Sequence, residues 1–209
     1  MIIIDDFIKD EILLNDIKNK KDFFGKNGNF MWWNGWWNNQ ADTLKKRLIE
    51  YIWRYNSPDK SYDISGFEYW TGVYGDGHPN TDLGWHFDKD ELHWKRTGGQ
   101  ENDGEIITPE IGTVFYPMDT EFEGGYLEIE KSNGEVERIE PKFNRLIIFN
   151  AGGDKHRVTK VKNGVRYAIA INLWQAVPVA AQEETMTMEK PEFSIPLSIK
   201  SNGLKGGLS

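Results

Sequence analysis

The chain has 209 residues, of which 38% are hydrophobic and 13% aromatic, and its formal net charge is −8. This length suits one domain with a sizeable core, so we expect residues 1–200 to form a single domain and residues 201–209 a flexible C-terminal tail. The absence of cysteine excludes disulfides and thiolate metal ligands. The acidic charge argues against a nucleic-acid partner, and no apolar run approaches the ~20 residues of a membrane span. Because Met1–Ile4 also lacks the features of a signal peptide, we expect a cytoplasmic enzyme or binding domain.

The first third of the chain is predicted to contain a short strand followed by two helices. Ile2–Ile4 is apolar and β-branched, which favours an edge strand. Two sets of apolar residues then recur at helical spacing, and Asp42 is expected to cap the second helix. The first set is Phe7, Leu13, Leu14 and Ile17, and the second is Leu44, Leu48, Tyr51 and Ile52.

Four tryptophans lie within residues 32–37, between the two predicted helices. Core or rim packing at the start of a helix explains such a cluster without any ligand, and this is the favoured interpretation. Contact with a substrate is the alternative, because indole rings also provide flat, amphipathic binding surfaces. The sequence leaves the role of the Trp32–Trp37 cluster open.

From Ser65 onward the apolar residues follow a period of two, which is typical of strands. The expected strands are Gly66–Tyr74, Gly112–Tyr116, Tyr126–Glu130, Glu135–Ile139, Leu146–Phe149 and Arg166–Trp174. Asn133-Gly134 is a strong hairpin signal, and the alternation in Tyr126–Glu130 places its glutamates on the face opposite its apolar residues. These features predict a mainly β protein with supporting helices, built on a jelly-roll core. A last strand, Phe193–Ile199, contains Pro196 and therefore belongs at a sheet edge, which leaves open whether the protein is a monomer or a homodimer.

The strand that begins at Arg166 has two contrasting faces. Its odd positions, from Tyr167 to Leu173, are large and apolar, whereas its even positions combine Arg166 with Ala168 and Ala170. Small side chains beside an arginine are expected on the wall of a cavity, because they leave room for a ligand. An arginine in a cavity needs a carboxylate partner, since an unpaired buried charge is costly. The alternative is an exposed arginine on a solvent-facing surface.

Three potential metal ligands stand in His86-Phe87-Asp88 and, much later, at His156. The spacing of His86 and Asp88 places both side chains on one face of a strand. Two histidines and one carboxylate leave coordination positions open, which is the ligand set of non-heme Fe(II) oxygenases. Asp90 and Glu91 are expected to be solvated, and His78 and His93 to lie in polar loops.

From about Ile64 to Pro178, the chain resembles the Fe(II)- and 2-oxoglutarate-dependent dioxygenases, especially the prolyl-4-hydroxylase-like branch. The matching segments occur in the order of that family. They are Tyr74-Gly75-Asp76-Gly77, His86-Phe87-Asp88, Phe115-Tyr116-Pro117, Gly124-Gly125-Tyr126-Leu127, Asn144-Arg145-Leu146-Ile147-Ile148-Phe149, His156-Arg157-Val158 and Gly164-Val165-Arg166-Tyr167. The fold implied by the resemblance is the double-stranded β-helix.

The resemblance implies a role for each matching residue. His86, Asp88 and His156 would hold catalytic Fe(II), and Arg166 would bind the distal carboxylate of 2-oxoglutarate. Tyr116 and Tyr74 match positions where relatives often place a cosubstrate-binding tyrosine. The implied reaction uses dioxygen and couples oxidative decarboxylation of 2-oxoglutarate to hydroxylation of a substrate, with ascorbate as a further candidate cofactor. Candidate substrates are prolyl residues in a peptide or protein, or a small molecule.

Residues 91–111, rich in glycine, threonine and charge, are expected to form a loop or lid beside the metal, where the substrate would be selected. Two other classes of protein remain as alternatives. One is a noncatalytic, tryptophan-rich jelly roll that binds carbohydrate or peptide, and the other is a cupin-type metal enzyme that does not use 2-oxoglutarate. Neither of these alternatives would need Arg166.

Overall fold

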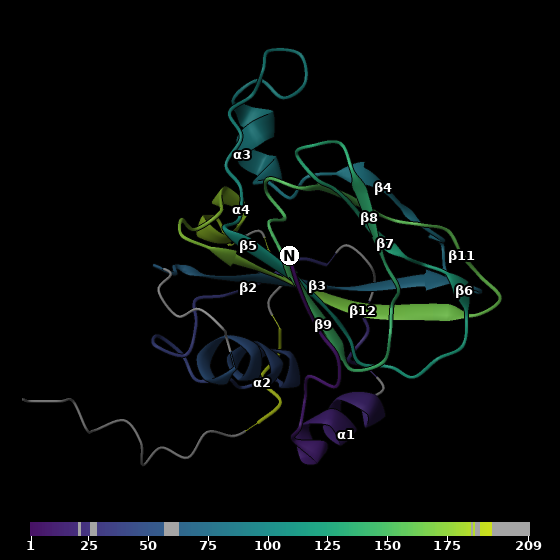
Figure 1. Cartoon of the computed structure of the whole chain (residues 1–209). Helices are drawn as coiled ribbons and strands as arrows, with labels where there is room; N and C mark the ends of the chain where they lie inside the picture. The colour runs from purple at the N-terminus through teal and green to yellow at the C-terminus, as the bar shows by residue number, and fades with distance from the viewer. Residues whose placement is uncertain (21, 26–28, 57–62, 185, 187–188, 194–209) are drawn as a thin grey trace, which may run out of the picture.

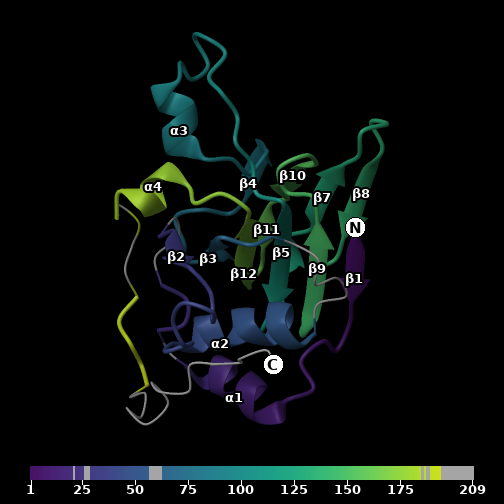
Figure 2. The same ribbon diagram turned by 90° about the vertical axis from the view of Figure 1, so that its left-hand side faces the viewer.

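The computed structural model describes residues 1–20, 22–25, 29–56, 63–184, 186 and 189–193. Two antiparallel sheets pack face to face, and two helices cover the outer side of the larger sheet (Figures 1 and 2). This architecture is the predicted double-stranded β-helix with supporting helices. The predicted tail and the predicted strand around Pro196 lie outside the described residues.

The larger, or major, sheet has six strands and the minor sheet has four. The order in the major sheet is β1 (Ile2–Ile4), β9 (Arg145–Phe149), β5 (Ile111–Tyr116), β12 (Val165–Trp174), β3 (Gly66–Gly75) and β2 (Met31–Trp33). The order in the minor sheet is β4 (Leu83–His86), β10 (Lys155–Val158), β7 (Leu127–Glu130) and β8 (Val136–Ile139). A short pair, β6 (Glu123–Gly124) and β11 (Val161–Lys162), completes the strands of the described residues.

The six strands predicted between Gly66 and Trp174 are confirmed as β3, β5, β7, β8, β9 and β12, with ends that differ by at most one residue. Ile2–Ile4 is confirmed as an edge strand and pairs with β9. The longest pairing joins β12 to β3 over ten residues, from Val165↔Gly75 to Trp174↔Gly66. Because of this long pairing, β12 provides a firmly held backbone for the side chains that it places between the two sheets.

Helix α1 (Glu11–Asn19) is capped by Asp10, whose Oδ1 accepts hydrogen bonds from the backbone of Ile12 and Leu13. Helix α2 (Leu44–Glu50) runs into a π-helical turn, Tyr51–Tyr55. The prediction that Asp42 caps α2 is wrong. Thr43 is the cap, because the Asp42 carboxylate is engaged 2.6 Å from the ammonium of Lys46. No helix in the described part of the chain is long and apolar enough to span a bilayer.

Two separate apolar cores flank the major sheet. The core on the helix side contains Ile17, Leu48, Ile49, Phe67, Tyr69, Phe115 and Ile171 among others. The core between the sheets contains Val114, Tyr116, Leu127, Ile129, Ile139, Ile147, Phe149, Ala151 and Ala168. Strand residues alternate between these two cores because successive side chains point to opposite faces.

The tryptophan cluster divides between the two faces of the major sheet. Trp33 is buried in the helix-side core, and Trp36 packs against that core beside Phe67. The packing interpretation is therefore confirmed for these two residues. Trp37 contacts Phe67 as well but stays 44% exposed. Trp32 alternates with Trp33 along β2 and so projects from the opposite face of the sheet, toward the minor sheet.

Candidate metal and cosubstrate site

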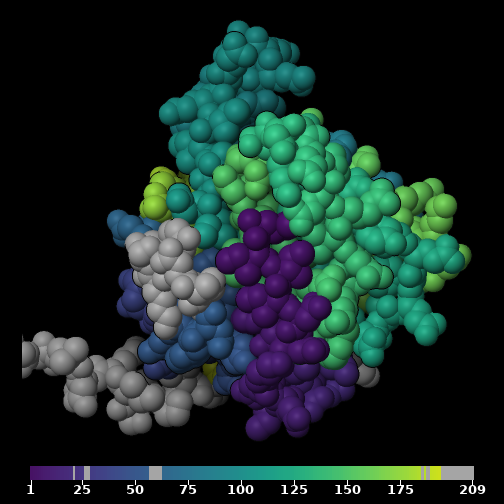
Figure 3. Space-filling model, viewed as in Figure 1, coloured from purple at the N-terminus to yellow at the C-terminus, as the bar shows by residue number. Residues whose placement is uncertain are grey.

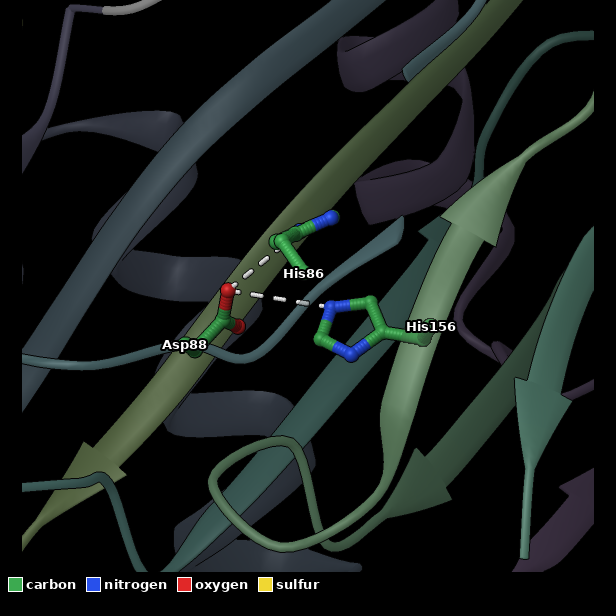
Figure 4. A group of neighbouring side chains, drawn as sticks. All are labelled: His86, Asp88 and His156. Atoms are coloured by element: carbon green, nitrogen blue, oxygen red, sulfur yellow. Dashed lines mark ion pairs between the residues drawn. The ribbon is translucent and has the colours of Figure 1, made fainter. Parts of the chain in front are cut away.

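His86 and His156 are direct cross-strand partners on β4 and β10 of the minor sheet. Their ring centroids are 4.2 Å apart, and Figure 4 shows both side chains next to Asp88. The ring of Phe149, from the inner face of the major sheet, packs edge to face against His156. The strand pairing therefore brings together two histidines that are 70 positions apart in the sequence.

Asp88 completes the cluster from the segment that follows β4. Since β4 ends at His86, the prediction that both residues share a strand is wrong for Asp88. Its backbone N–H instead donates to the carbonyl oxygen of Ala151, 3.0 Å away. Its Oδ1 atom lies 3.6 Å from Nε2 of His86 and 3.7 Å from Nε2 of His156. All three potential ligand atoms lie within 4.8 Å of one another.

The hydrogen bonds of the two imidazoles suit a metal at this point. Nδ1 of His86 lies 2.7 Å from the carbonyl oxygen of Gly84, and Nδ1 of His156 lies 3.0 Å from that of Asp154. Each Nδ1 thus carries the proton, which leaves the lone pair of each Nε2 directed at the shared centre. Burial also lowers the pKa of His156, against the opposing influence of Asp88, so its neutral, ligating form is favoured. Two imidazoles and one carboxylate fit Fe(II).

Asn172 is a site residue that was not singled out from the sequence. Its Nδ2 donates to Oδ2 of Asp88 over 3.0 Å, and its side chain is almost fully buried. Asn172 lies on the same face of β12 as Arg166, six positions further on. The alternation that drew attention to Arg166 therefore also pointed to Asn172.

Arg166 lies between the sheets and is only 2% exposed. Its Nη2 donates to the Tyr116 hydroxyl over 3.0 Å, and the guanidinium lies over the rings of Tyr116 and Tyr74, 4.9 and 5.7 Å from their centroids. Its Nε has no hydrogen-bond partner, and no carboxylate pairs with it among the described residues. A buried guanidinium without an anion is unfavourable, so this arrangement calls for a carboxylate from a ligand.

The absence of a side chain at Gly125 leaves space for the side chain of Arg166. A Cβ atom at this position would lie 2.9 Å from Cδ of Arg166 and 3.2 Å from the ring of Phe122. The backbone here also has φ of +65°, which favours glycine. Gly125 belongs to the Gly124-Gly125-Tyr126-Leu127 segment of the resemblance, and this contact is a physical reason for a glycine there.

The remaining candidates from the sequence lie outside the cluster. The prediction that His93 lies in a polar loop is wrong, because His93 is part of helix α3 (Glu91–Arg96) and pairs with Glu105 at 2.9 Å. His78 lies in the turn after β3, as expected. Glu91 is exposed and pairs with Lys89, as expected for a solvated residue. The prediction that Asp90 is solvated is wrong, because it is 4% exposed and accepts hydrogen bonds from two backbone N–H groups, those of His93 and Val179.

Residues 91–111 begin with helix α3 (Glu91–Arg96), which stands out from the rest of the surface together with the loop that follows it (Figure 3). Arg96 forms an ion pair with Glu183, just after helix α4 (Val179–Gln182). Since α3 starts three residues after Asp88, it borders the candidate metal site. Its action as a lid stays a prediction.

Comparisons with known proteins agree with this geometry. The profile of the 2OG-Fe(II) oxygenase superfamily matches residues 69–174, just over half of the chain. This chain therefore belongs to the 2OG-Fe(II) oxygenase superfamily, whose cofactor and cosubstrate are Fe(II) and 2-oxoglutarate. No protein with a curated description matches the sequence.

Several solved structures are similar to this chain at low sequence identity. A prolyl hydroxylase from Trichoplax adhaerens, solved with a hypoxia inducible factor peptide fragment, is 17% identical over 90% of this chain and 87% of its own, with a TM-score of 0.50. The viral collagen prolyl hydroxylase of Paramecium Bursaria Chlorella virus-1 is 17% identical over 84% and 96%, with a TM-score of 0.47. A Pseudomonas putida prolyl-4-hydroxylase is 16% identical, with a TM-score of 0.42, and this chain covers 60% of its length.

Proposed function

We propose that this protein is an Fe(II)- and 2-oxoglutarate-dependent dioxygenase that hydroxylates its substrate. His86, Asp88 and His156 would hold the iron, and Arg166 with Tyr116 would hold the distal carboxylate of 2-oxoglutarate. The observation that carries this proposal is the buried Arg166 guanidinium, which has no anionic partner among the described residues and faces the same interior as the cluster.

Iron, 2-oxoglutarate and dioxygen together supply the oxidation, in which one oxygen atom enters succinate, carbon dioxide is released and the other oxygen converts a C–H bond to C–OH. The residues of this chain would bind and orient the iron and the 2-oxoglutarate. Arg166 offers two parallel N–H groups to a carboxylate, while the rings of Tyr116 and Tyr74 shield that ion pair from water. Asn172 keeps one oxygen of Asp88 hydrogen-bonded, which favours coordination through the other oxygen alone.

For the substrate, we propose a peptide or protein, with a prolyl residue as the first candidate, or else a small molecule. Membership in the superfamily supports oxygenation, and the likeness in fold to a prolyl hydroxylase solved with a peptide fragment supports a peptide as the first candidate. We also propose ascorbate as the reductant that sustains turnover. Neither a cupin-type enzyme nor a noncatalytic binding protein would account for the burial of Arg166 without an anionic partner among the described residues.

The proposal is tested by iron titration and by succinate formation from 2-oxoglutarate with Fe(II) and ascorbate present. Replacing Arg166 with Gln should raise the KM for 2-oxoglutarate by about 100-fold, because truncating one partner of a buried charge pair costs roughly 2–5 kcal/mol. The matched control is Arg54→Gln, which removes an exposed arginine on the helix side. Iron binding without any 2-oxoglutarate turnover, or an unchanged KM in the Arg166 variant, would overturn the proposal.

A further inference from the structure

A row of side chains crosses the inner face of the major sheet beside the candidate metal site. Its members are successive cross-strand partners on β2, β3, β12, β5 and β9: Trp32, Glu68, Asn172, Gly112 and Phe149. Directly opposed residues of antiparallel strands project from the same face. Asn172 touches Asp88, and Phe149 touches His156, so this row faces the cluster. Glu68 is the immediate neighbour of Asn172 in the row.

The Glu68 carboxyl group has only neutral hydrogen-bond partners. It accepts from Nε1 of Trp174 at 3.2 Å and from the side-chain amide of Asn172. No lysine, arginine or histidine pairs with it among the residues that the structure describes. Two other glutamates with little exposed side chain differ in this respect, because Glu128 pairs with two arginines and Glu189 pairs with Lys45. Glu68 therefore lacks the counter-charge that comparable carboxylates of this chain possess.

The surroundings of Glu68 suit a cation. Burial raises the pKa of Glu68 to about 8, and the nearby carboxylates of Asp88 and Asp90 contribute to the increase. A positive group placed beside Glu68 would lower the pKa of Glu68 and favour its ionised form, and so would oppose the influence of burial and of the two carboxylates. The glutamate residue as a whole is partly exposed.

Indole rings lie on both sides of Glu68 on the same face. Trp32 opposes it on β2, and the Trp32 ring covers Gly66, where a Cβ atom would lie 2.3 Å from the indole. Trp70 follows two positions along β3 and packs against Phe30, with ring centroids 4.9 Å apart. Trp32 and Trp70 are both partly exposed. Indole faces attract ammonium and guanidinium groups, so the aromatic and acidic side chains favour the same class of ligand.

We propose that Glu68, with Trp32 and Trp70 beside it, binds a positively charged nitrogen group of the substrate, an ammonium or a guanidinium. This proposal rests on the proposed oxygenase function and specifies its substrate class. Along the inner face, Arg166 and Asn172 are six positions apart on β12, or roughly 20 Å at 3.3 Å per residue. Arg166 at one end would receive the anionic cosubstrate, and Glu68, whose neighbour Asn172 contacts Asp88, would receive the basic substrate at the other end.

The test compares two probes of the same size and shape, n-butylammonium and n-butanol, on protein loaded with Mn(II) and 2-oxoglutarate. Saturation-transfer NMR measures binding, and paramagnetic relaxation of the probe protons measures their nearness to the metal. We expect the ammonium to bind at least tenfold more tightly than the alcohol and to show the stronger relaxation. Replacing Glu68 with Gln should weaken binding of the ammonium by roughly tenfold or more and leave binding of the alcohol within about twofold.

The matched control is Glu11→Gln, which removes an exposed glutamate on α1, on the opposite side of the major sheet. Equal binding of the two probes to the wild-type protein would overturn the proposal without any variant. Undiminished ammonium binding to Glu68→Gln would also overturn it. Succinate formation by the wild-type enzyme reports separately on the proposed function, so a failure of the oxygenase assignment is distinguishable from a failure of cation binding.

Discussion

Asn172 donates a hydrogen bond to Oδ2 of Asp88, while Oδ1 of the same carboxylate is the atom near both histidines. The two oxygens of Asp88 thus have separate partners. With Oδ2 engaged by Asn172, Asp88 would offer Oδ1 to an Fe(II) ion, and a single carboxylate oxygen among the ligands would leave room for the cosubstrate and dioxygen. Outer hydrogen bonds of this kind orient the ligands of metal sites and tune the affinity for the metal.

Replacing Asn172 with Ala should weaken Fe(II) binding by about 10–100-fold, the usual cost of losing an outer partner of a metal ligand. Anaerobic metal titration measures this affinity directly. The control is Asn39→Ala, in an exposed turn before α2. Unchanged iron affinity in a folded Asn172→Ala protein would show that the hydrogen bond does not position Asp88.

Metal binding should stabilise the fold through the same three side chains. A ligand present at 100 times its dissociation constant adds about 2.7 kcal/mol to the free energy of unfolding. We therefore expect Mn(II) to raise the melting temperature of the wild-type protein and EDTA to reverse the increase. Asp88→Ala should abolish the effect, whereas His93→Ala, outside the cluster, should retain it. An equal shift in Asp88→Ala would place the metal elsewhere.

Gly125→Ala should damage the cosubstrate site in particular. The new Cβ would lie 2.9 Å from Cδ of Arg166, in addition to the strain of an alanine at positive φ. Gly134→Ala is a matched control, since that glycine has φ of +80° but no atom within 4 Å of the place that a Cβ would take. Both variants should lose about 1 kcal/mol of stability from backbone strain. Only Gly125→Ala should also raise the KM for 2-oxoglutarate, and equal KM values in the two variants would contradict the contact argument.

Glu128 should contribute stability that disappears in acid. Burial opposes its ionisation, but hydrogen bonds from Arg157 and Arg138 outweigh burial and hold the pKa of Glu128 below its usual value. A carboxyl group whose pKa is lowered on folding stabilises the protein above its unfolded pKa, and this contribution is lost as the pH falls through the folded pKa. The difference in unfolding free energy between wild type and Glu128→Gln should be roughly 1 kcal/mol at pH 7.

That difference should shrink as the pH falls below about 4, near the unfolded pKa of glutamate. Chemical denaturation at a series of pH values measures it. A difference that is constant from pH 7 to pH 3 would contradict the ion-pair explanation. The alternation along β7 predicted the face on which Glu128 lies, but it did not predict the two arginines of neighbouring strands that cover this carboxylate.

Local patterns predicted most of the sheets, because period-two alternation and the Asn133-Gly134 turn are short-range signals. The contrast between the two faces of the Arg166 strand also argued against a solvent-facing arginine, and Arg166 and Ala168 are indeed buried. Three features were missed. One of them is local, since Asp42 pairs with Lys46 four positions on and Thr43 caps α2 instead. The other two depend on tertiary contacts, because Asp90 is buried where it binds the backbone of Val179, and Asn172 reaches Asp88 only once β12 lies opposite the segment after β4.

The pairing of His86 with His156 has a mechanical consequence. β4 is the outermost strand of the minor sheet, held by β10 alone, and its register with β10 shifts between His156 and Val158. An ion bound to both imidazoles would cross-link this edge strand to β10, the one strand with which it pairs in the minor sheet. Metal binding should therefore slow amide hydrogen exchange in residues 83–86 more than in the interior strands. The ion that serves the chemistry would also stabilise the strand pairing that carries its own ligands.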